Sequence, residues 1–257
     1  MTAARVIVTR PAAEAQRWTE ALRSRGVDAE ALPLIEIAAA PDPEAVAHAW
    51  QGLSACRAVM FVSANAVHHF MAARGEVVLP AGLRAWSTGP GTQAALLATG
   101  WLPEQVDSPA HEAGRFDSEA LWALVGSRLS RGQRVLIVRG ADAEGLLAGR
   151  DWLARQLVEA GVDVLQCVAY TRRAPDWTPQ RQAQAAQAWR DGAWWLFSSA
   201  EAARHLQQHC AEWPMPHARA LATHPRIAER LQQDGWSRVV LVPAGLDRMV
   251  ESIKSLT

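Results

Sequence analysis

FVSANAV, at residues 61–67, returns in altered form as FSSAEAA at residues 197–203. Two further pairs of landmarks are separated by the same distance. AWSTGP at residues 85–90, followed by GW at 100–101, matches ALATHP at residues 220–225, followed by GW at 235–236, and GVD occurs at both 26–28 and 161–163. All three offsets are about 135 residues, roughly half of the 257-residue chain. A shared offset favours an internal repeat over chance similarity, and it predicts two similar units.

Strand-like and helix-like segments alternate along the chain. The strand-like runs are short and apolar and end in small polar residues, at 6–9, 59–63, 85–88, 135–139, 194–199, 220–223 and 239–242. Between them, apolar residues recur at helical spacing, as at Trp18 and Leu22 or at Leu153 and Leu157. Strands this apolar are typical of parallel sheets with helices on both faces. We therefore expect an α/β protein.

Length and composition restrict the class of protein. A chain of 257 residues is about twice the commonest size of a single domain, which agrees with two units. Hydrophobic residues make up 49% and charged residues 20%, which excludes a disordered or coiled-coil chain. The 26 basic and 26 acidic residues balance, so neither nucleic acid nor a membrane surface is an expected partner. Because no signal peptide and no apolar run of about 20 residues is seen, we expect a cytoplasmic protein.

Several kinds of chemistry find little support in the sequence. The three cysteines are scattered and form no CxxC pair, which speaks against a disulfide framework or a zinc ribbon. Lys254 is the sole lysine and stands near the end of the chain, so Schiff-base chemistry is not expected. His205 and His209 stand four apart beside Cys210, a spacing able to hold a metal, but no further ligand is evident and we expect no metal site.

Two extended segments are candidates for the linkers between the units. LPLIEI, at residues 32–37, and QCVAYTR, at residues 166–172, each come shortly after a GVD landmark. Prolines follow both segments, at Pro41 and Pro43 and at Pro175 and Pro179, which is typical of linkers. The repeat does not say where the units divide, because the chain can cross between them more than once.

An ordered series of short motifs resembles the uroporphyrinogen-III synthase family over essentially the whole chain. The motifs are Thr9-Arg10-Pro11, LPLIEI at 32–37, FVSANAV at 61–67, GPGT at 89–92, FDSE at 116–119, VLIVRG at 135–140 and VAY at 168–170. The resemblance implies two flavodoxin-like (Rossmann-like) three-layer lobes with parallel sheets, joined by a two-stranded linker. Residues 1–35 and 173–257 would form the first lobe, residues 41–165 the inserted second lobe, and residues 36–40 and 166–172 the paired linker strands.

The resemblance also implies an activity. The family closes a linear tetrapyrrole, hydroxymethylbilane, into a macrocycle in haem and sirohaem biosynthesis, inverting the last pyrrole ring and expelling water without a metal or organic cofactor. It implies a monomer, with hand-over of substrate from hydroxymethylbilane synthase. Because unassisted closure proceeds without inversion, the protein must hold the substrate so that the other carbon attacks, which is a positioning problem. The alternative is a cytoplasmic two-lobed binding or sensor protein without catalysis, since fold alone cannot separate the two.

The substrate carries eight carboxylates, which suit strand ends that lead into helix N-termini, because these present free N–H groups and positive dipole ends. Two such edges facing across a cleft would hold this polyanion. The expected binding residues are Arg10, Ser63, Ala64, Asn65, Gly89, Thr92, Arg139, Gly140, Ser198, Ser199 and Thr223. For the turns the alternative is ordinary helix capping, as the spacing of Ser198 and Glu201 suggests, and for the arginines it is a solvated surface position. If the turns bind, Ser63→Ala and Thr92→Ala weaken product affinity with little change in melting temperature.

Tyr170 is the sole tyrosine and matches the family's tyrosine between the lobes. The resemblance places it as a donor to the departing hydroxyl, which a phenol can be because it stays protonated at neutral pH. The alternative is a side chain packed at the linker. The family's threonine is carried onto Thr92, but the repeat has Ile227 at the matching position, where Thr223 or Arg226 could serve instead.

Overall fold

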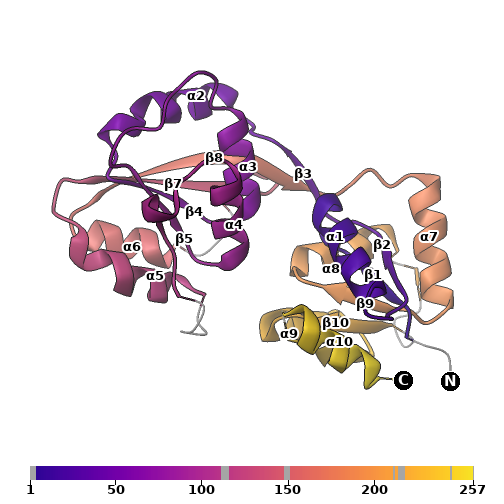
Figure 1. The fold of residues 1–257 in the computed structure, drawn as a ribbon. Coiled ribbons are helices and arrows are strands. Elements are labelled where there is room, and N and C mark those ends of the chain that lie inside the picture. Colours follow the sequence, from indigo (N-terminus) through magenta and orange to yellow (C-terminus); the bar gives the residue numbers. More distant parts are fainter. Residues whose placement is uncertain are drawn as a thin grey trace. The chain divides into compact units, whose positions relative to one another are not determined.

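The chain forms two units, and the sequence of one unit is inserted into the sequence of the other. The computed structural model describes residues 4–110, 116–147, 151–210, 212–213, 218–243 and 245–256. One unit is made of Met1–Glu36 with Arg173–Thr257 and the other of Ile37–Arg172 (Figure 1). Both chain termini therefore belong to the first unit. Within the described ranges, no helix has the length and apolar character needed to cross a membrane.

The first unit contains a sheet of five parallel strands in the order β11-β10-β9-β1-β2. The strands are β1 (Val6–Val8), β2 (Ala29–Ala31), β9 (Trp194–Phe197), β10 (Arg219–Ala222) and β11 (Arg238–Leu241). The helices are α1 (Ala12–Arg23), α7 (Pro179–Arg190), α8 (Ala200–His209), α9 (Pro225–Gln233) and α10 (Leu246–Lys254). Buried residues of α1 and α10 pack with Val8 and Leu196. Trp195 immediately precedes Leu196 in β9 and faces the other side of the sheet, where it contacts Trp189 of α7.

The second unit contains a sheet of six strands in the order β3-β8-β7-β4-β5-β6. The strands are β3 (Glu36–Ala39), β4 (Ala58–Phe61), β5 (Arg84–Ser87), β6 (Val106–Asp107), β7 (Arg134–Ala141) and β8 (Asp163–Arg173). The helices are α2 (Pro43–Gln51), α3 (Ala64–Ala72), α4 (Pro90–Ala98), α5 (Ser118–Val125) and α6 (Trp152–Glu159), with 3-10 turns at Gly52–Ala55, Pro103–Gln105 and Gly126–Arg128.

Alternation along the central strands divides the second unit into three layers. Phe61 and Val138 pack with buried residues of α2, α3 and α4. Met60 and Ile137, one residue earlier in each strand, pack with buried residues of α5 and α6. Figure 1 shows the two sets of helices on opposite faces of this sheet. The predicted fold class, α/β with mainly parallel sheets covered on both faces, is confirmed.

The second extended segment, residues 166–172, lies within β8, whereas the first, residues 32–37, overlaps β3 only at its last two residues. The strands β3 and β8 lie next to each other. The pairing expected for them is confirmed. β8 is eleven residues long and also pairs in parallel with β7, so β3 and β8 both belong to the sheet of the second unit. The pairing of β7 with β8 is interrupted by a register shift between Arg139 and Gly140.

The internal repeat appears as the same aromatic pair in each unit. Trp101 packs edge-on against Phe61 with ring centroids 6.4 Å apart, and Trp236 packs edge-on against Phe197 at 5.2 Å. Each tryptophan follows a glycine with a positive φ, 99° at Gly100 and 88° at Gly235, a conformation that lets the chain turn back from the preceding helix. The repeat thus places one buried indole at the matching helix-to-strand connection of each unit.

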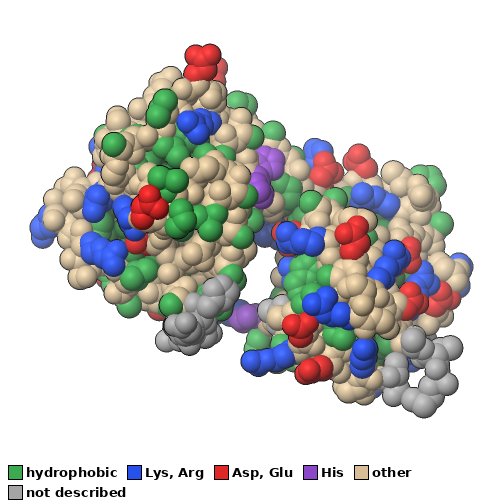
Figure 2. All heavy atoms as spheres, viewed as in Figure 1, with side chains coloured by type: hydrophobic (Ala, Val, Ile, Leu, Met, Phe, Trp, Pro, Cys, Tyr) green, Lys and Arg blue, Asp and Glu red, His purple; other side chains and the backbone are tan. Residues whose placement is uncertain are grey.

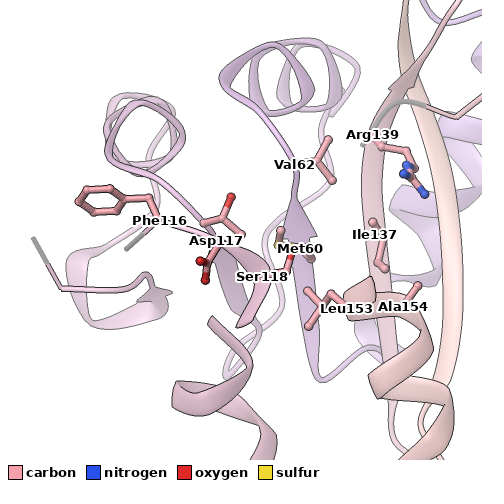
Figure 3. A pocket seen from close by; sticks show the side chains of 10 residues that line it. Met60, Val62, Phe116, Asp117, Ser118, Ile137, Arg139, Leu153 and Ala154 are labelled. Atoms are coloured by element: carbon pink, nitrogen blue, oxygen red, sulfur yellow. The ribbon is translucent and has the colours of Figure 1, made fainter. Parts of the chain in front are cut away.

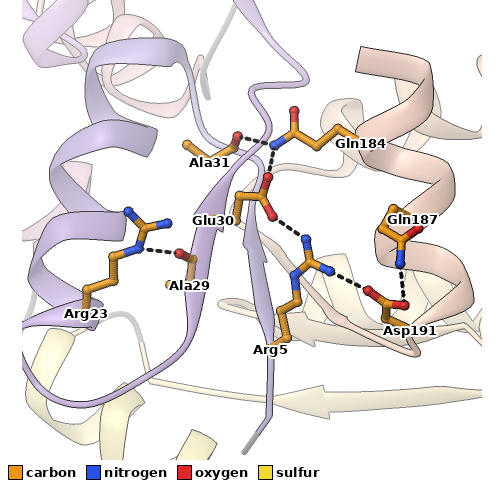
Figure 4. A network of polar contacts seen from close by, with 8 residues as sticks. All are labelled: Arg5, Arg23, Ala29, Glu30, Ala31, Gln184, Gln187 and Asp191. Atoms are coloured by element: carbon orange, nitrogen blue, oxygen red, sulfur yellow. Dashed lines mark hydrogen bonds and ion pairs between the residues drawn. The ribbon is translucent and has the colours of Figure 1, made fainter. Parts of the chain in front are cut away.

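A polar network joins the two distant chain segments of the first unit (Figure 4). Arg5, just before β1, pairs with Glu30 of β2 and with Asp191, which follows α7, at 2.5 Å for the second pair. Gln184 of α7 donates to the Glu30 carboxylate and to the carbonyl of Ala31. The network ties residues near the N-terminus to residues more than 150 positions later in sequence.

Candidate functional site

The site residues expected from the sequence lie at the carboxyl edges of the two sheets. In the second unit, Ser63, Ala64 and Asn65 follow β4, Gly89 and Thr92 follow β5, and Arg139 and Gly140 lie near the end of β7. In the first unit, Arg10 follows β1, Ser198 and Ser199 follow β9, and Thr223 follows β10. Each set comes from three neighbouring parallel strands, which end at the same edge. The structure therefore gathers each set within its own unit.

Ser63 connects a helix cap to the sole tyrosine. Its Oγ accepts the backbone N–H of Ala66 at 3.1 Å, which caps α3, and lies 3.1 Å from the hydroxyl of Tyr170. Ala64 and Asn65 form the first two positions of α3. Because an N-cap side chain satisfies one of the free N–H groups at a helix start, Ser63 has a structural role whatever it binds.

Tyr170 is buried on β8, with an exposed fraction of 3%. Its ring lies on the backbone of Gly140, its neighbour on β7, and a Cβ at that glycine would come within 2.4 Å of the ring. The ring of His69 on α3 stacks beside it, with centroids 5.7 Å apart. Burial lowers the pKa of His69, and the neighbouring His68 adds to this. Packing within the second unit therefore holds Tyr170, and the hydroxyl contacts Ser63.

Arg139 is not a surface residue, so the solvated alternative considered for it is wrong. Its exposed fraction is 1%, and its Nη1 donates to Asp151 at 2.8 Å and to Gln166 at 2.9 Å. Arg139 and Ile137 line a cavity on the α5 and α6 face of this sheet (Figure 3), whereas Tyr170 packs on the α3 face. Both partners were missed in the sequence, because they stand 12 and 27 residues away in no recognisable motif.

Arg10 is also largely buried, with its side chain 16% exposed, which contradicts the solvated alternative. Its guanidinium lies over the indole of Trp18 at 4.3 Å and pairs with Glu14 at 3.1 Å. Burial lowers the pKa of Arg10, although Glu14 opposes this. The ring and the carboxylate fix the orientation of the guanidinium at the carboxyl end of β1.

The sequence suggested that Ser198 caps the helix after β9, but the structure assigns this role to the next serine. Ser199, not Ser198, caps α8, because its Oγ accepts the N–H of Glu201 at 3.2 Å. The capping-box interpretation of Ser198 is therefore wrong. Its Oγ is buried and has no hydrogen-bond partner among the described residues. A buried hydroxyl in that state can still bind a polar ligand group.

The turns after β5 and β10 differ at one position of the repeat, where the second unit has Thr92 and the first unit has Ile227. Gly89 precedes α4 without any side-chain cap, and Thr92 stands in the first turn with an exposed fraction of 8%. In the first unit, His224 caps α9 through Nδ1, which accepts the N–H of Arg226. Ile227 holds the position equivalent to Thr92 and is equally buried at 8%. An apolar side chain thus fills the matching place in the core, and Thr223 precedes the capping residue.

The histidine pair on α8 has packing roles. Nδ1 of the buried His205 donates to the carbonyl of Leu34 at 2.7 Å, and His209 stacks on Trp177. Burial raises the pKa of the Cys210 thiol to about 12, which disfavours the thiolate that binds metals. In the part of the chain that the structure describes, no three metal-binding side chains form a cluster.

Ser63→Ala is expected to lower the free energy of unfolding by about 1 kcal/mol, because α3 loses its cap. This changes the sequence-based expectation of an unchanged melting temperature for that variant. Urea denaturation measures the effect, and Ser63→Thr, which keeps a capping hydroxyl, is the control. An unchanged denaturation midpoint for Ser63→Ala would contradict the capping role.

Comparison with known proteins gives a family and two related folds. A family model described as Uroporphyrinogen-III synthase HemD matches residues 16–251. A mutant uroporphyrinogen III synthase from the extremely thermophilic bacterium Thermus thermophilus matches with a TM-score of 0.58 at 19% identity, over 98% of this chain and 98% of that chain. Uroporphyrinogen-III synthetase from Helicobacter pylori matches with a TM-score of 0.55 at 17% identity, over 100% of each chain. At these identities the structural matches support the fold.

Proposed function

The chain belongs to the uroporphyrinogen-III synthase family, and from this premise we propose that it closes hydroxymethylbilane into uroporphyrinogen III. The reaction inverts the last pyrrole ring and releases water, so the enzyme is a hydro-lyase, and we propose that it uses no metal or organic cofactor. The observation that carries the proposal is the family match across residues 16–251. The carboxyl-edge residues of both sheets agree with a substrate that carries many carboxylates.

In this proposal the carboxyl edge of each sheet offers groups that can bind substrate carboxylates. The start of α4, which no side chain caps, and the buried hydroxyl of Ser198 are the groups best placed to meet carboxylates. No side chain caps the first N–H groups of α4, and the Ser198 hydroxyl has no partner among the described residues, so both can bind a ligand oxygen. Arg10, held by Trp18 and Glu14, adds a positive charge at the edge of the first sheet. Binding several carboxylates at fixed points would restrict how the last ring can turn, which is the positioning that inversion requires.

Tyr170→Phe is expected to lower turnover roughly tenfold and to leave the product as the type III isomer. A tenfold drop is the effect expected when one hydrogen bond to a reacting group is lost. Tyr170 and Ser63 are in contact, and we propose that the pair acts on the departing hydroxyl, with Ser63 nearer the substrate because Tyr170 is buried. Initial rates with freshly generated hydroxymethylbilane measure the effect. Wild-type turnover in Tyr170→Phe would remove the phenol from the mechanism.

We propose a monomeric cytoplasmic enzyme that takes its substrate directly from hydroxymethylbilane synthase and binds neither nucleic acid nor membranes. Figure 2 shows basic and acidic side chains interspersed on the visible face of each unit, and the formal net charge is zero. We therefore expect a polyanionic substrate to bind through specific hydrogen-bonding groups, because no broad basic surface is seen on that face.

The decisive test is to incubate the purified protein with freshly generated hydroxymethylbilane and to separate the type I and type III isomers. We expect the type III isomer to predominate. A product that is purely type I, the result of unassisted closure, would overturn the proposal. The alternative of a binding or sensor protein without catalysis is not favoured by the family match, and it predicts that same type I result.

A further inference from the structure

Four of the described strands begin with an arginine: Arg84 in β5, Arg134 in β7, Arg219 in β10 and Arg238 in β11. The two in the second unit are each paired with an acid, Asp107 at 2.6 Å and Asp163 at 2.7 Å. Among the residues that the structure describes, no acid pairs with Arg219 or Arg238, and both side chains are exposed. The edge of the first sheet at which its strands begin therefore carries two positive charges that no ion pair to a described residue balances.

Arg219 and Arg238 lie side by side over one buried indole. β10 runs between β9 and β11, and Arg219 is aligned with Trp194 on one side and with Arg238 on the other. Aligned residues of neighbouring parallel strands point to the same face of the sheet. The guanidinium carbons of Arg238 and Arg219 lie 5.0 Å and 6.0 Å from the centroid of the Trp194 ring, and this tryptophan is 2% exposed. The same ring thus holds two guanidinium groups.

This arrangement has a cost that packing on the indole does not explain. Like charges at directly aligned positions of neighbouring strands repel each other. The stem of one arginine would cover the ring, and a second charge adds nothing to that role. The acids Glu30 and Asp191 lie at the same edge of the sheet, but both are paired with Arg5. A ligand with about two negative charges would remove the repulsion and would accept hydrogen bonds from both guanidinium groups.

We propose that Arg219 and Arg238 form a binding site for a phosphoryl group, either free phosphate or a phosphate ester. Two guanidinium groups on different strands can donate to different oxygens of one tetrahedral anion, whereas a single guanidinium engages both oxygens of a planar carboxylate. A phosphoryl group carries a charge of about −1.5 to −2 at neutral pH and so balances both arginines. The site is at the opposite end of the strands from the carboxyl edge proposed to bind the substrate, so its test does not depend on turnover.

Isothermal titration of the intact protein with inorganic phosphate, glycerol phosphate and acetate, in a dilute zwitterionic buffer, tests the proposal. The phosphate compounds are expected to bind at least roughly tenfold more tightly than acetate, and the tighter of the two identifies the source of the group. Arg219→Gln and Arg238→Gln should each weaken phosphate binding at least roughly tenfold, because each removes charge-assisted hydrogen bonds. Arg134→Gln is the matched control, since it removes the same charge from the start of a strand, but from an arginine that Asp163 already binds.

Thermal unfolding separates ligand binding from a purely structural role of the two arginines. At low salt without phosphate, Arg238→Gln is expected to melt at the same temperature as the wild type or higher, because the repulsion is relieved. With saturating phosphate the wild type should melt higher than this variant, which the ligand no longer stabilises. Arg238→Lys, which keeps the charge and the stem but not the planar fork, should retain part of the phosphate effect. If phosphate did not bind the wild type, bound Arg238→Gln and Arg134→Gln equally, or left the melting temperature of Arg238→Gln lowered to the same extent as without it, the arginines would only cover Trp194 and the proposal would be overturned.

Discussion

Gly140→Ala is expected to lower the free energy of unfolding by about 3 kcal/mol and to reduce formation of the type III isomer roughly tenfold or more. The added Cβ would lie 2.4–2.8 Å from three atoms of the Tyr170 ring, closer than non-bonded atoms can approach. The ring cannot retreat freely, because His69 stacks beside it and its hydroxyl contacts Ser63. Either the strands separate or the tyrosine moves, and both outcomes disturb the carboxyl edge of the sheet.

Two comparisons isolate this contact in urea denaturation and rate measurements. Gly52→Ala is the matched control, because no atom lies within 4 Å of a Cβ built there and its φ of −79° suits alanine. In a Tyr170→Ala background, Gly140→Ala should cost far less stability, since the ring it would strike is gone. A stability loss that is the same in both backgrounds would show that the glycine is required for a reason other than the tyrosine.

The elements and the fold class were predictable from the sequence because they depend on local patterns. Apolar strand runs and helical spacing are read directly from neighbouring residues, and the repeat made the two-unit architecture visible. The same reasoning placed the polar residues at strand ends, since in a parallel sheet those ends meet at one edge. The structure adds the aromatic pair, Trp101 with Phe61 and Trp236 with Phe197, as the physical basis of the repeat.

The direction and partners of individual side chains were not predictable, because they depend on tertiary contacts. The sequence predicts that Arg139 either binds a substrate carboxylate or is solvated, but its partners Asp151 and Gln166 come from later in the chain and are not marked by any local pattern. The register shift after Arg139 brings Gly140 opposite Tyr170, and nothing in the local pattern marks it. Ser198 and Ser199 could each cap α8, and only the backbone geometry at the end of β9 assigns the cap to Ser199.

Trp101→Ala and Trp236→Ala are each expected to lower the stability of one unit by about 3–5 kcal/mol, the usual cost of deleting a large buried aromatic side chain. Trp101 belongs to the core cluster around β4 and α3, whereas Trp236 packs on Phe197 of β9. Hydrogen exchange followed by mass spectrometry measures the effect segment by segment. Trp101→Ala should accelerate exchange in Phe61 and its neighbours, and Trp236→Ala in Phe197 and its neighbours, with the other unit little changed.

Phenylalanine at the same positions is the informative control. The indole N–H groups of Trp101 and Trp236 are both buried without a hydrogen-bond partner among the described residues. Each carries a desolvation cost that phenylalanine removes, while its ring keeps much of the edge-on contact. Trp→Phe should therefore cost less than half as much as Trp→Ala in either unit. If each alanine variant instead accelerated exchange equally throughout the chain, the units would unfold as one, and the repeated pair would not belong to two separate cores.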